Sequence, residues 1–313
     1  MEFRGKALAD KVIGNVGKVI IGKDEIMKLI LTAMLAEGHI LLEDVPGTGK
    51  TKLAKALARS INGDYARIQF TPDLLPADIT GLNIYNRQTN EFVLRKGPIF
   101  TNILLADEIN RATPRTQAGL LECMEEKQAT IDGETYQMAK EFFVIATQNP
   151  VETAGTFPLP EAQMDRFIMK LSMGSLERGQ ELAVLSRYME ADPLDTLESV
   201  VTLEELRMAK EEVSKVYVHK CIQEYIVNLV AETRVGSSVV MGVSPRGSLA
   251  LMKCAKAYAA LSGREYCVPD DVKAVAPYVL PHRIILGYGD NNTEKFVDSI
   301  LRNTDVPTED FSA

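Results

Sequence analysis

Short apolar segments alternate with helical patterns over the first half of the chain. Helical spacing is clearest where apolar residues recur on one face, at Ile26, Leu29, Ile30 and Ala33 and then at Leu53, Ala54, Leu57 and Ile61. The apolar segments have the length of buried strands and occupy residues 39–42, 66–70, 102–106, 142–146 and 167–171. Strands that alternate with helices form parallel sheets covered by helices. The pattern therefore predicts an α/β fold with a five-stranded parallel sheet.

Two further segments have the pattern of β-hairpins. Residues 82–97 alternate polar and apolar positions around a polar turn, and residues 128–137 carry Asp132 and Gly133 at their centre. Asp-Gly is a strong signal for a tight hairpin turn, because both residues tolerate positive φ. We predict that these hairpins are excursions from the main sheet.

The pattern changes near Gly174 and is helical from there to about residue 301. Thr202 and Glu205 form a capping box, and Pro269 opens a helix with acidic residues in its first turn. Pro245 begins another helix, whose predicted buried positions are Leu249, Leu251 and Cys254. The predicted organisation is an α/β domain at 1–174, a small all-helical domain at 175–301 and a tail at 302–313.

A glycine-rich loop follows the first apolar segment and precedes a helix. It reads Asp44-Val45-Pro46-Gly47-Thr48-Gly49-Lys50-Thr51. Glycines let backbone N–H groups curl around phosphate oxygens, and the positive end of the new helix adds to the attraction. In such a loop Lys50 reaches the outer phosphates and Thr51 binds Mg²⁺. The usual pattern begins with glycine where this chain has Asp44, and a simple turn before a helix is the alternative interpretation.

An acidic pair, Asp107 and Glu108, follows the segment 102–106. Ligands bind at the carboxyl ends of strands in an open α/β sheet. We predict that Asp107 holds Mg²⁺ through its water shell and that Glu108 is the base that orients and polarises the attacking water. A solvated acidic turn is the alternative, but the accompanying glycine-rich loop favours a nucleotide site.

Two other segments are candidates for the same site. Asn149 follows the segment 142–146 and would fix the catalytic water beside the acidic pair, although an Asn-Pro turn is the alternative. Ile20, Ile21 and Gly22 are candidates for the wall and backbone contact of an adenine ring. A core-packing turn explains these three residues equally well.

Composition limits the classes of function. The chain has 313 residues and a formal net charge of -8, with a pI near 5.2. An acidic total argues against broad binding to nucleic acid. We expect no membrane span and no secretory signal, because the apolar runs are short and the start lacks an apolar core. The four cysteines and three histidines show no metal-ligand spacing, so a reduced, cytoplasmic protein is predicted.

Five motifs together resemble the MoxR branch of the AAA+ ATPases. They are Asp-Val-Pro-Gly-Thr-Gly-Lys-Thr at 44–51, Ala-Asp-Glu-Ile-Asn-Arg at 106–111, Ala-Thr-Gln-Asn-Pro at 146–150, Leu-Pro-Glu-Ala-Gln-Met-Asp-Arg-Phe at 159–167 and the segment 242–246. Asp44 looks ordinary for this branch. The resemblance extends over most of the chain, and it implies a Mg²⁺-dependent ATPase with a phosphate-loop core and a helical lid.

The resemblance also implies roles that spacing alone does not single out. Arg166 matches the arginine finger, which reaches the γ-phosphate of a neighbouring subunit, and Arg246 matches the second sensor of the lid. Whether Arg246 acts on its own nucleotide or on the neighbour's is left open. Gln69 is similar to a residue that restrains the catalytic glutamate until a partner binds. The two hairpins match insertions that point toward the pore of a ring.

The same resemblance implies a nucleotide-dependent ring, usually a hexamer, with ATP at the subunit boundaries. Members of the family act as chaperones that help a client protein mature, often by inserting a metal or cofactor. The client commonly carries a von Willebrand factor A domain. The residues by themselves identify neither the client nor the ring size, and they do not distinguish ATP from GTP.

Three alternative functions are open at this point. A DNA-dependent AAA+ motor shares related insertions, but the acidic total and the lack of a recognisable DNA-binding module argue against it. A motor subunit of a metal chelatase would differ in substrate rather than in mechanism. A nucleotide switch that does not hydrolyse is disfavoured by the intact Asp107, Glu108 and Arg166.

Overall fold

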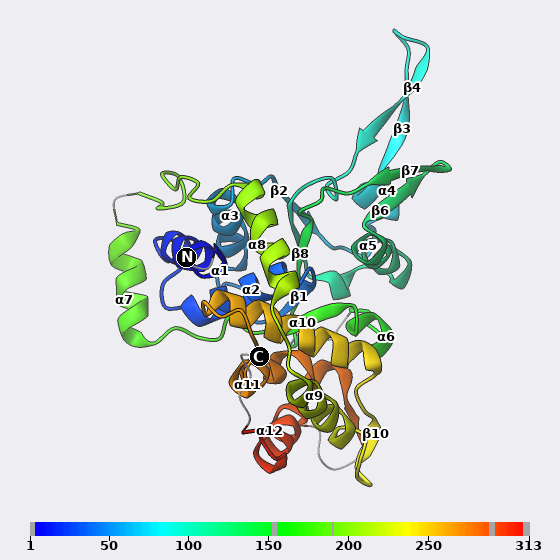
Figure 1. Ribbon diagram of the computed structural model, residues 1–313. Helices are drawn as coiled ribbons and strands as arrows, with labels where there is room; N and C mark the ends of the chain where they lie inside the picture. Colours follow the sequence, from blue (N-terminus) through cyan, green and yellow to red (C-terminus); the bar gives the residue numbers. More distant parts are fainter. Residues whose placement is uncertain (1–3, 152–154, 190, 288–291, 309–313) are drawn as a thin grey trace.

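A parallel sheet forms the centre of the computed structural model, which describes residues 4–151, 155–189, 191–287 and 292–308 (Figure 1). Its five strands, in spatial order, are β2 (Tyr65–Gln69), β5 (Ile103–Asp107), β8 (Phe143–Gln148), β1 (His39–Glu43) and β9 (Phe167–Leu171). All neighbouring pairs are parallel, so the strands deliver their carboxyl ends to one edge of the sheet. The predicted α/β fold is confirmed.

Alternate residues of the strands face two hydrophobic cores. Ile40 and Leu42 of β1 pack in a core with three helices, α1 (Arg4–Val16), α2 (Asp24–Leu35) and α3 (Lys50–Ser60). Leu41 faces the opposite core, which contains α4 (Pro76–Thr80), the short 3₁₀ helix η1 (Ile109–Arg111) and α5 (Pro114–Glu126). A strand covered on both faces is a continuous apolar run in the sequence, which is why these strands could be predicted. Periodicity did not predict α1.

The C-terminal region is a set of helices that packs against the first core. The helices are α8 (Leu203–Lys215), α9 (Lys220–Glu232), α10 (Pro245–Leu261), α11 (Pro269–Val279), the 3₁₀ helix η2 (Pro281–Arg283) and α12 (Thr293–Asn303). A short antiparallel pair, β10 (Val239–Met241) with β11 (Ile285–Leu286), interrupts the all-helical pattern that was expected. The capping box is confirmed, because Glu205 N donates to Thr202 Oγ1 at 3.2 Å.

One predicted burial in α10 is wrong. Leu249 is 56% exposed, whereas Leu251 and Cys254 are fully buried. Residues two apart on a helix point to different sides, so Leu249 and Leu251 cannot both face the same core.

Apolar residues on the two sides of residue 174 share a hydrophobic core, and the predicted division there stays a prediction. Helix α1 packs on α8, and α2 packs on α10, so apolar residues from both predicted domains form one cluster. Two short helices, α6 (Glu161–Met164) and α7 (Arg178–Arg187), flank β9 in the chain. The predicted tail begins within α12, and its last residues, 309–313, lie outside the described part of the chain.

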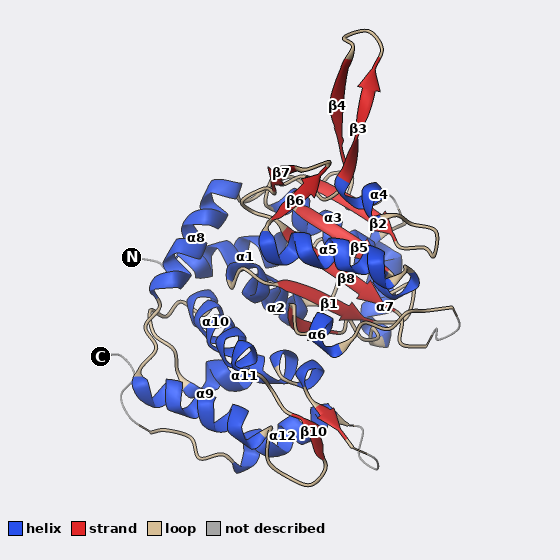
Figure 2. Cartoon of the chain, turned by 90° about the vertical axis from the view of Figure 1, so that its right-hand side faces the viewer, coloured by secondary structure: helices blue, strands red, loops and turns tan. Residues whose placement is uncertain are grey.

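Both predicted hairpins are present and stand on one side of the sheet domain. The hairpin of β3 (Gly81–Asn86) and β4 (Glu91–Lys96) projects far from the body, with β6 (Gln128–Ile131) and β7 (Glu134–Gln137) near its base (Figures 1 and 2). Near the tip of the first hairpin, the Tyr85 and Phe92 rings pack edge to face with centroids 5.4 Å apart. Phe92 is nevertheless 73% exposed, so this hairpin carries an apolar surface that the described residues leave open.

Candidate active site

The glycine-rich loop connects the carboxyl end of β1 to the start of α3. Gly47 and Gly49 adopt φ of +88° and +89°, a conformation that favours glycine. Gly49 is the N-cap of α3 and has no side chain, so no N-cap side chain accepts a hydrogen bond from the first N–H groups of the helix. Lys50 Nζ donates to the carbonyl of Asp44 at 2.9 Å, which folds its side chain along the loop. The loop thus has the backbone geometry of an anion site.

Asp44, the departure from the usual loop pattern, is a structural anchor. Its carboxylate is buried and accepts hydrogen bonds from Ser172 Oγ at 2.7 Å, Met173 N at 2.6 Å and Gly174 N at 3.2 Å. These three donors lie in the segment that follows β9. Asp44 therefore ties the start of the phosphate loop to the end of the neighbouring strand, a role that sequence spacing could not reveal.

Asp107 ends β5 and is held between two neighbouring strands. Thr147 of β8 donates its hydroxyl to Asp107 Oδ1 at 2.6 Å, and Arg67 of β2 donates to Oδ2 at 2.6 Å. Neither Thr147 nor Arg67 was predicted to belong to the site. Thr147 lies within the motif at 146–150, which was a signal in the sequence, whereas Arg67 reaches the site from the middle of β2, which only the topology makes a neighbour of β5.

Glu108 follows in a left-handed conformation, with φ of +56°, which is strained for a residue with a side chain. Its carboxylate oxygen Oε2 accepts from Gln69 Nε2 at 2.7 Å and from Arg111 at 3.1 Å. Its backbone N–H donates to the hydroxyl of Thr147 at 2.8 Å. The contact between Gln69 and Glu108 is the one that the family resemblance led us to expect.

Asn149 directly follows β8, beside the strand that carries Asp107. Its Oδ1 accepts from the backbone N–H of Val151 at 3.1 Å, which is the Asn turn that the sequence offered as an alternative. The same residue thus lies at the carboxyl edge and shapes the turn after the strand. Its contact with a catalytic water stays a prediction.

A pocket of about 270 Å³ adjoins the phosphate loop. Its lining residues include Gly47, Thr48 and Gly49 on the loop side, together with the predicted Ile20 and Ile21 and the unpredicted Lys52, Leu176, Val184 and Tyr188. Gly22 is not among the lining residues. With φ of +69° it forms the turn, and a Cβ atom there would come within 2.2 Å of the Gln180 side chain.

Tyr188 is the aromatic residue in the lining of this pocket. Lys52 Nζ lies 3.9 Å from the centroid of the Tyr188 ring and pairs with Asp192 at 2.9 Å. The hydrogen bond from Lys52 holds the pKa of Asp192 below its ordinary value. An apolar slot with one aromatic wall next to an anion-binding loop suits a purine nucleotide.

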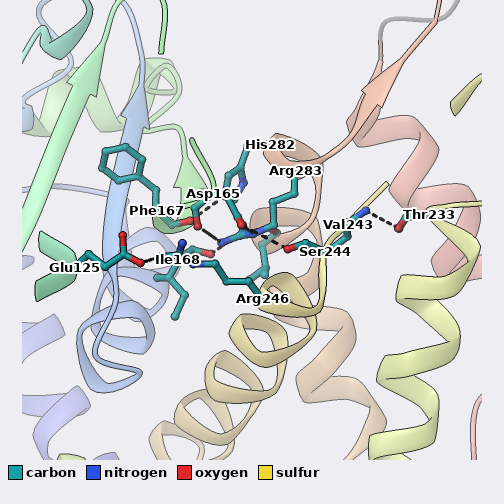
Figure 3. Close-up of polar contacts among 11 residues, drawn as sticks. Glu125, Asp165, Phe167, Ile168, Thr233, Val243, Ser244, Arg246, His282 and Arg283 are labelled. Atoms are coloured by element: carbon teal, nitrogen blue, oxygen red, sulfur yellow. Dashed lines mark hydrogen bonds and ion pairs between the residues drawn. The ribbon is translucent and has the colours of Figure 1, made fainter. Parts of the chain in front are cut away.

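The two predicted catalytic arginines lie at the opposite edge of the sheet. Arg166 immediately precedes β9, and its Nε is 3.2 Å from Glu125 Oε2. Arg246, at the start of α10, donates to the other oxygen of Glu125 at 3.0 Å (Figure 3). Glu125 is next to Met124, whose carbonyl accepts from His39 at the start of β1. A five-residue strand spans about 15 Å, so neither arginine is near its own phosphate loop.

His39 is a buried, neutral residue at the amino edge of the sheet. Val144 N donates to its Nδ1 at 3.0 Å, so Nε2 carries the proton that it donates to Met124 O at 3.1 Å. Burial lowers the pKa of His39 to about 4. The amino ends of β1 and β8 are therefore locked to the end of α5, which carries Glu125.

Comparison with known proteins assigns the family. Residues 39–169 match the model of the ATPase family associated with various cellular activities (AAA), and residues 231–304 match the AAA lid domain. The chain is 39% identical to Chaperone MoxR1 of Mycobacterium tuberculosis, over 95% of this chain and 82% of that protein. The chain belongs to the MoxR family of AAA+ ATPases. It is 30% identical to Protein MoxR of Methylorubrum extorquens, over 87% of this chain and 86% of that one.

Two further relatives of this MoxR-family chain match it over nearly its whole length. It is 52% identical to the uncharacterized protein YeaC of Bacillus subtilis, over 96% of each protein. A crystal structure from Cytophaga hutchinsonii, of a protein provisionally named an ATPase, superposes with a TM-score of 0.90 at 40% identity over 97% of both chains. The MoxR-family protein is thus an ATPase with an AAA core and a lid. None of the helices in the described ranges is long and apolar enough to cross a membrane.

Proposed function

We propose that this MoxR-family ATPase hydrolyses ATP at the boundary between two subunits of a ring and uses the cycle to remodel or mature a client protein. One observation carries the proposal. Lys50 and the Asp107-Glu108 pair lie at the carboxyl edge of the sheet, whereas Arg166 lies at the amino edge. Catalytic residues on opposite edges can form one site only when the amino edge of one copy meets the carboxyl edge of the next.

Within one subunit, the phosphates of ATP would contact the N–H groups of the loop 45–49 and the ammonium of Lys50. Thr51 and Asp107 fit a magnesium site, because Mg²⁺ prefers oxygen ligands and α3, which carries Thr51, packs against β5. In this proposal Thr51 binds the ion directly and Asp107 holds it through water. When bound, Mg²⁺ neutralises charge on the phosphate oxygens.

Glu108 is the proposed general base. Its carboxylate would orient the attacking water and accept its proton, and Asn149 would hold that water from the neighbouring strand. The hydrogen bond from Gln69 directs the carboxylate toward β2. Release of this contact when a neighbour or client binds would free Glu108 for catalysis.

Arg246 is proposed to act on the neighbour's nucleotide together with Arg166. The two guanidinium groups share one carboxylate, that of Glu125. Two cations held this close at the amino edge would approach the same γ-phosphate across the boundary. The Glu125 carboxylate then pairs with the two guanidinium groups until the neighbour's γ-phosphate replaces it.

The relatives and one exposed element support a proposal for the assembly and the client. A hexamer is the proposed ring, with the hairpin of β3 and β4 facing its pore. The apolar tip of that hairpin, with Phe92 73% exposed, is suited to hold a client segment. We further propose that the client has a von Willebrand factor A domain and that a metal or cofactor is inserted into it. The name Chaperone MoxR1 of the M. tuberculosis relative supports the chaperone role.

Tyr188→Ala is expected to weaken binding of ATP about tenfold, since stacking of a base on an aromatic ring is worth about 1–3 kcal/mol. Titration with a fluorescent ATP analogue in the presence of Mg²⁺ measures the dissociation constant. Tyr188→Phe keeps the ring and is expected to bind as the wild type does. Met189→Ala removes a neighbouring side chain that is 82% exposed and serves as the matched control. An unchanged affinity of Tyr188→Ala would place the base elsewhere.

Assembly tests the boundary site directly. Glu108→Gln protein, examined by light scattering with Mg²⁺ and ATP, is expected to gather into a ring that dissociates when ATP is removed. Adding Arg166→Ala is expected to weaken the ring, because the contact with the neighbour's γ-phosphate is lost. Lys50→Ala in the same background is the control that should not assemble. If the Glu108→Gln protein binds ATP and stays monomeric at every concentration, the boundary mechanism is wrong.

A further inference from the structure

Arg283 is a buried arginine whose role neither the motifs nor the proposed mechanism explains. It ends the 3₁₀ helix η2 in the lid and is 5% exposed. Its guanidinium reaches across to the segment between α6 and β9 in the sheet domain (Figure 3). That segment carries Arg166.

The contacts of Arg283 enclose Arg166 on both sides in the chain. Nε donates to the carboxylate of Asp165 at 2.6 Å, and Nη2 donates to the carbonyls of Asp165 at 3.2 Å and Phe167 at 2.8 Å. Nη1 donates to the carbonyl of Ile168 at 3.3 Å. One rigid group thus fixes the backbone directly before and directly after the finger residue.

Only an arginine can make this set of contacts. Its guanidinium has five N–H donors in a fixed plane, whereas the ammonium of lysine is a compact point charge. Burial lowers the pKa of Arg283, while the charge of Asp165 opposes that shift. A buried charge is tolerated when it is paired and fully hydrogen-bonded, which describes this guanidinium.

The other contacts on the two sides of Arg166 are unequal. On its carboxyl side, Phe167 is fully buried in β9, and its carbonyl also lies 2.9 Å from His282 Nε2. On its amino side, burial is slight. Helix α6 has four residues and none of them is buried. The side chain of Arg166 is itself 31% exposed and contacts Glu125 through one ion pair. Ser244, at the start of α10, adds a long hydrogen bond of 3.5 Å to Asp165, so a second lid element reaches the same carboxylate. The lid therefore supplies the main anchor on the amino side of Arg166, at Asp165.

We propose that Arg283 is a positioning residue for the arginine finger, holding Arg166 in place from the lid of the same subunit. The inference rests on the proposed function, in which Arg166 acts on the neighbour's nucleotide. Because the anchor comes from the lid, the orientation of one subunit's lid sets the rate of hydrolysis in the next subunit.

The first test is the kinetics of Arg283→Met and Arg283→Lys. Arg283→Met is expected to lower kcat about 10²-fold, the cost of an ångström-scale misplacement of a catalytic group. Arg283→Lys, which keeps the charge and loses the planar contacts, is expected to lower it about tenfold. ATP affinity should stay within about twofold of wild type in both, since the phosphate loop lies at the other edge of the sheet.

Arg264→Met is the matched control. Arg264 forms an ion pair with the buried Asp271 within the lid and, in the part of the chain that the structure describes, makes no polar contact with residues 165–168. Its loss should lower the stability of the lid without changing kcat by more than about twofold. If Arg264→Met lowers kcat as much as Arg283→Met does, the effect reflects lid stability and the positioning role is wrong.

Mixed rings separate positioning from misfolding. Glu108→Gln subunits lack the base and keep the finger, whereas Arg283→Met subunits keep the base and lose the finger's position. Each protein alone is inactive, and each supplies the group that the other lacks. In a 1:1 mixture, about a quarter of the boundaries therefore combine an intact base with a correctly held finger. A mixture of Arg283→Met with Arg166→Ala should stay inactive, because both lack the finger.

The outcomes distinguish the inference from the function on which it rests. A mixture of Glu108→Gln with Arg166→Ala that regains activity supports the boundary mechanism. If that mixture recovers and Glu108→Gln with Arg283→Met does not, the positioning role is wrong while the proposed function stands. If neither mixture recovers, the boundary mechanism itself fails. If Arg283→Met does not assemble, the same mixtures are made with Arg283→Lys, and wild-type kcat in that variant overturns the inference.

Discussion

Arg166→Ala is expected to lower ATP turnover about 10³–10⁵-fold, the range by which arginine fingers accelerate phosphoryl transfer. The dissociation constant of ATP should change little, because Arg166 precedes β9 at the amino edge while the phosphate loop follows β1 at the carboxyl edge. Steady-state phosphate release measures turnover, and titration with a fluorescent nucleotide measures affinity.

Arg207→Ala provides the control for this prediction. Arg207 lies on α8 and, among the residues that the structure describes, forms only a local ion pair with Glu204, so its loss should leave turnover unchanged. A large fall in ATP affinity for Arg166→Ala, with no recovery in a mixture with Glu108→Gln, would mean that Arg166 serves its own subunit. The division of the site between two edges would then have no functional meaning.

Glu108→Gln is expected to lower turnover by about 10²–10⁴-fold, the contribution of a positioned general base. Glutamine keeps the size of the side chain but is not basic, so ATP should bind about as tightly as in the wild type. A single-turnover measurement with excess protein separates the chemical step from product release.

Glu224→Gln is the matched control for the base. Glu224 lies on α9, is exposed and pairs with Lys220 at 3.6 Å, so its loss should not change turnover. Turnover of Glu108→Gln near the wild-type rate would show that another group activates the water. Loss of ATP binding in Glu108→Gln would instead assign Glu108 a role in shaping the site, through its left-handed backbone.

Glu125 connects these predictions. It holds both Arg166 and Arg246 in the single chain, at 3.2 and 3.0 Å. Both pairs are partly exposed, so each is weak and can exchange for a phosphate without a large cost. In the proposed mechanism, the amino edge is therefore ready to engage a neighbour before ATP brings the subunits together.

Local patterns in the sequence determined the elements and the chemistry of the carboxyl edge. The buried strands are continuous apolar runs, and the residues at their ends, such as Lys50, Asp107 and Glu108, belong to motifs within a few positions of a strand. Such residues can be assigned from sequence because a parallel sheet brings the carboxyl ends of its strands together whatever their order. The five-stranded fold and the helical lid were predicted on the same grounds.

The tertiary structure alone decided which groups can act together. Arg166 and Arg246 are separated from their own phosphate loop by the length of a strand, and only the strand order and lid packing reveal this. Tyr188 and Arg283 enter their sites from elements far along the chain, and each looks like an ordinary polar residue in the sequence. Local periodicity carries information over a few residues, whereas these contacts depend on how whole helices pack, which is set by the complete hydrophobic core.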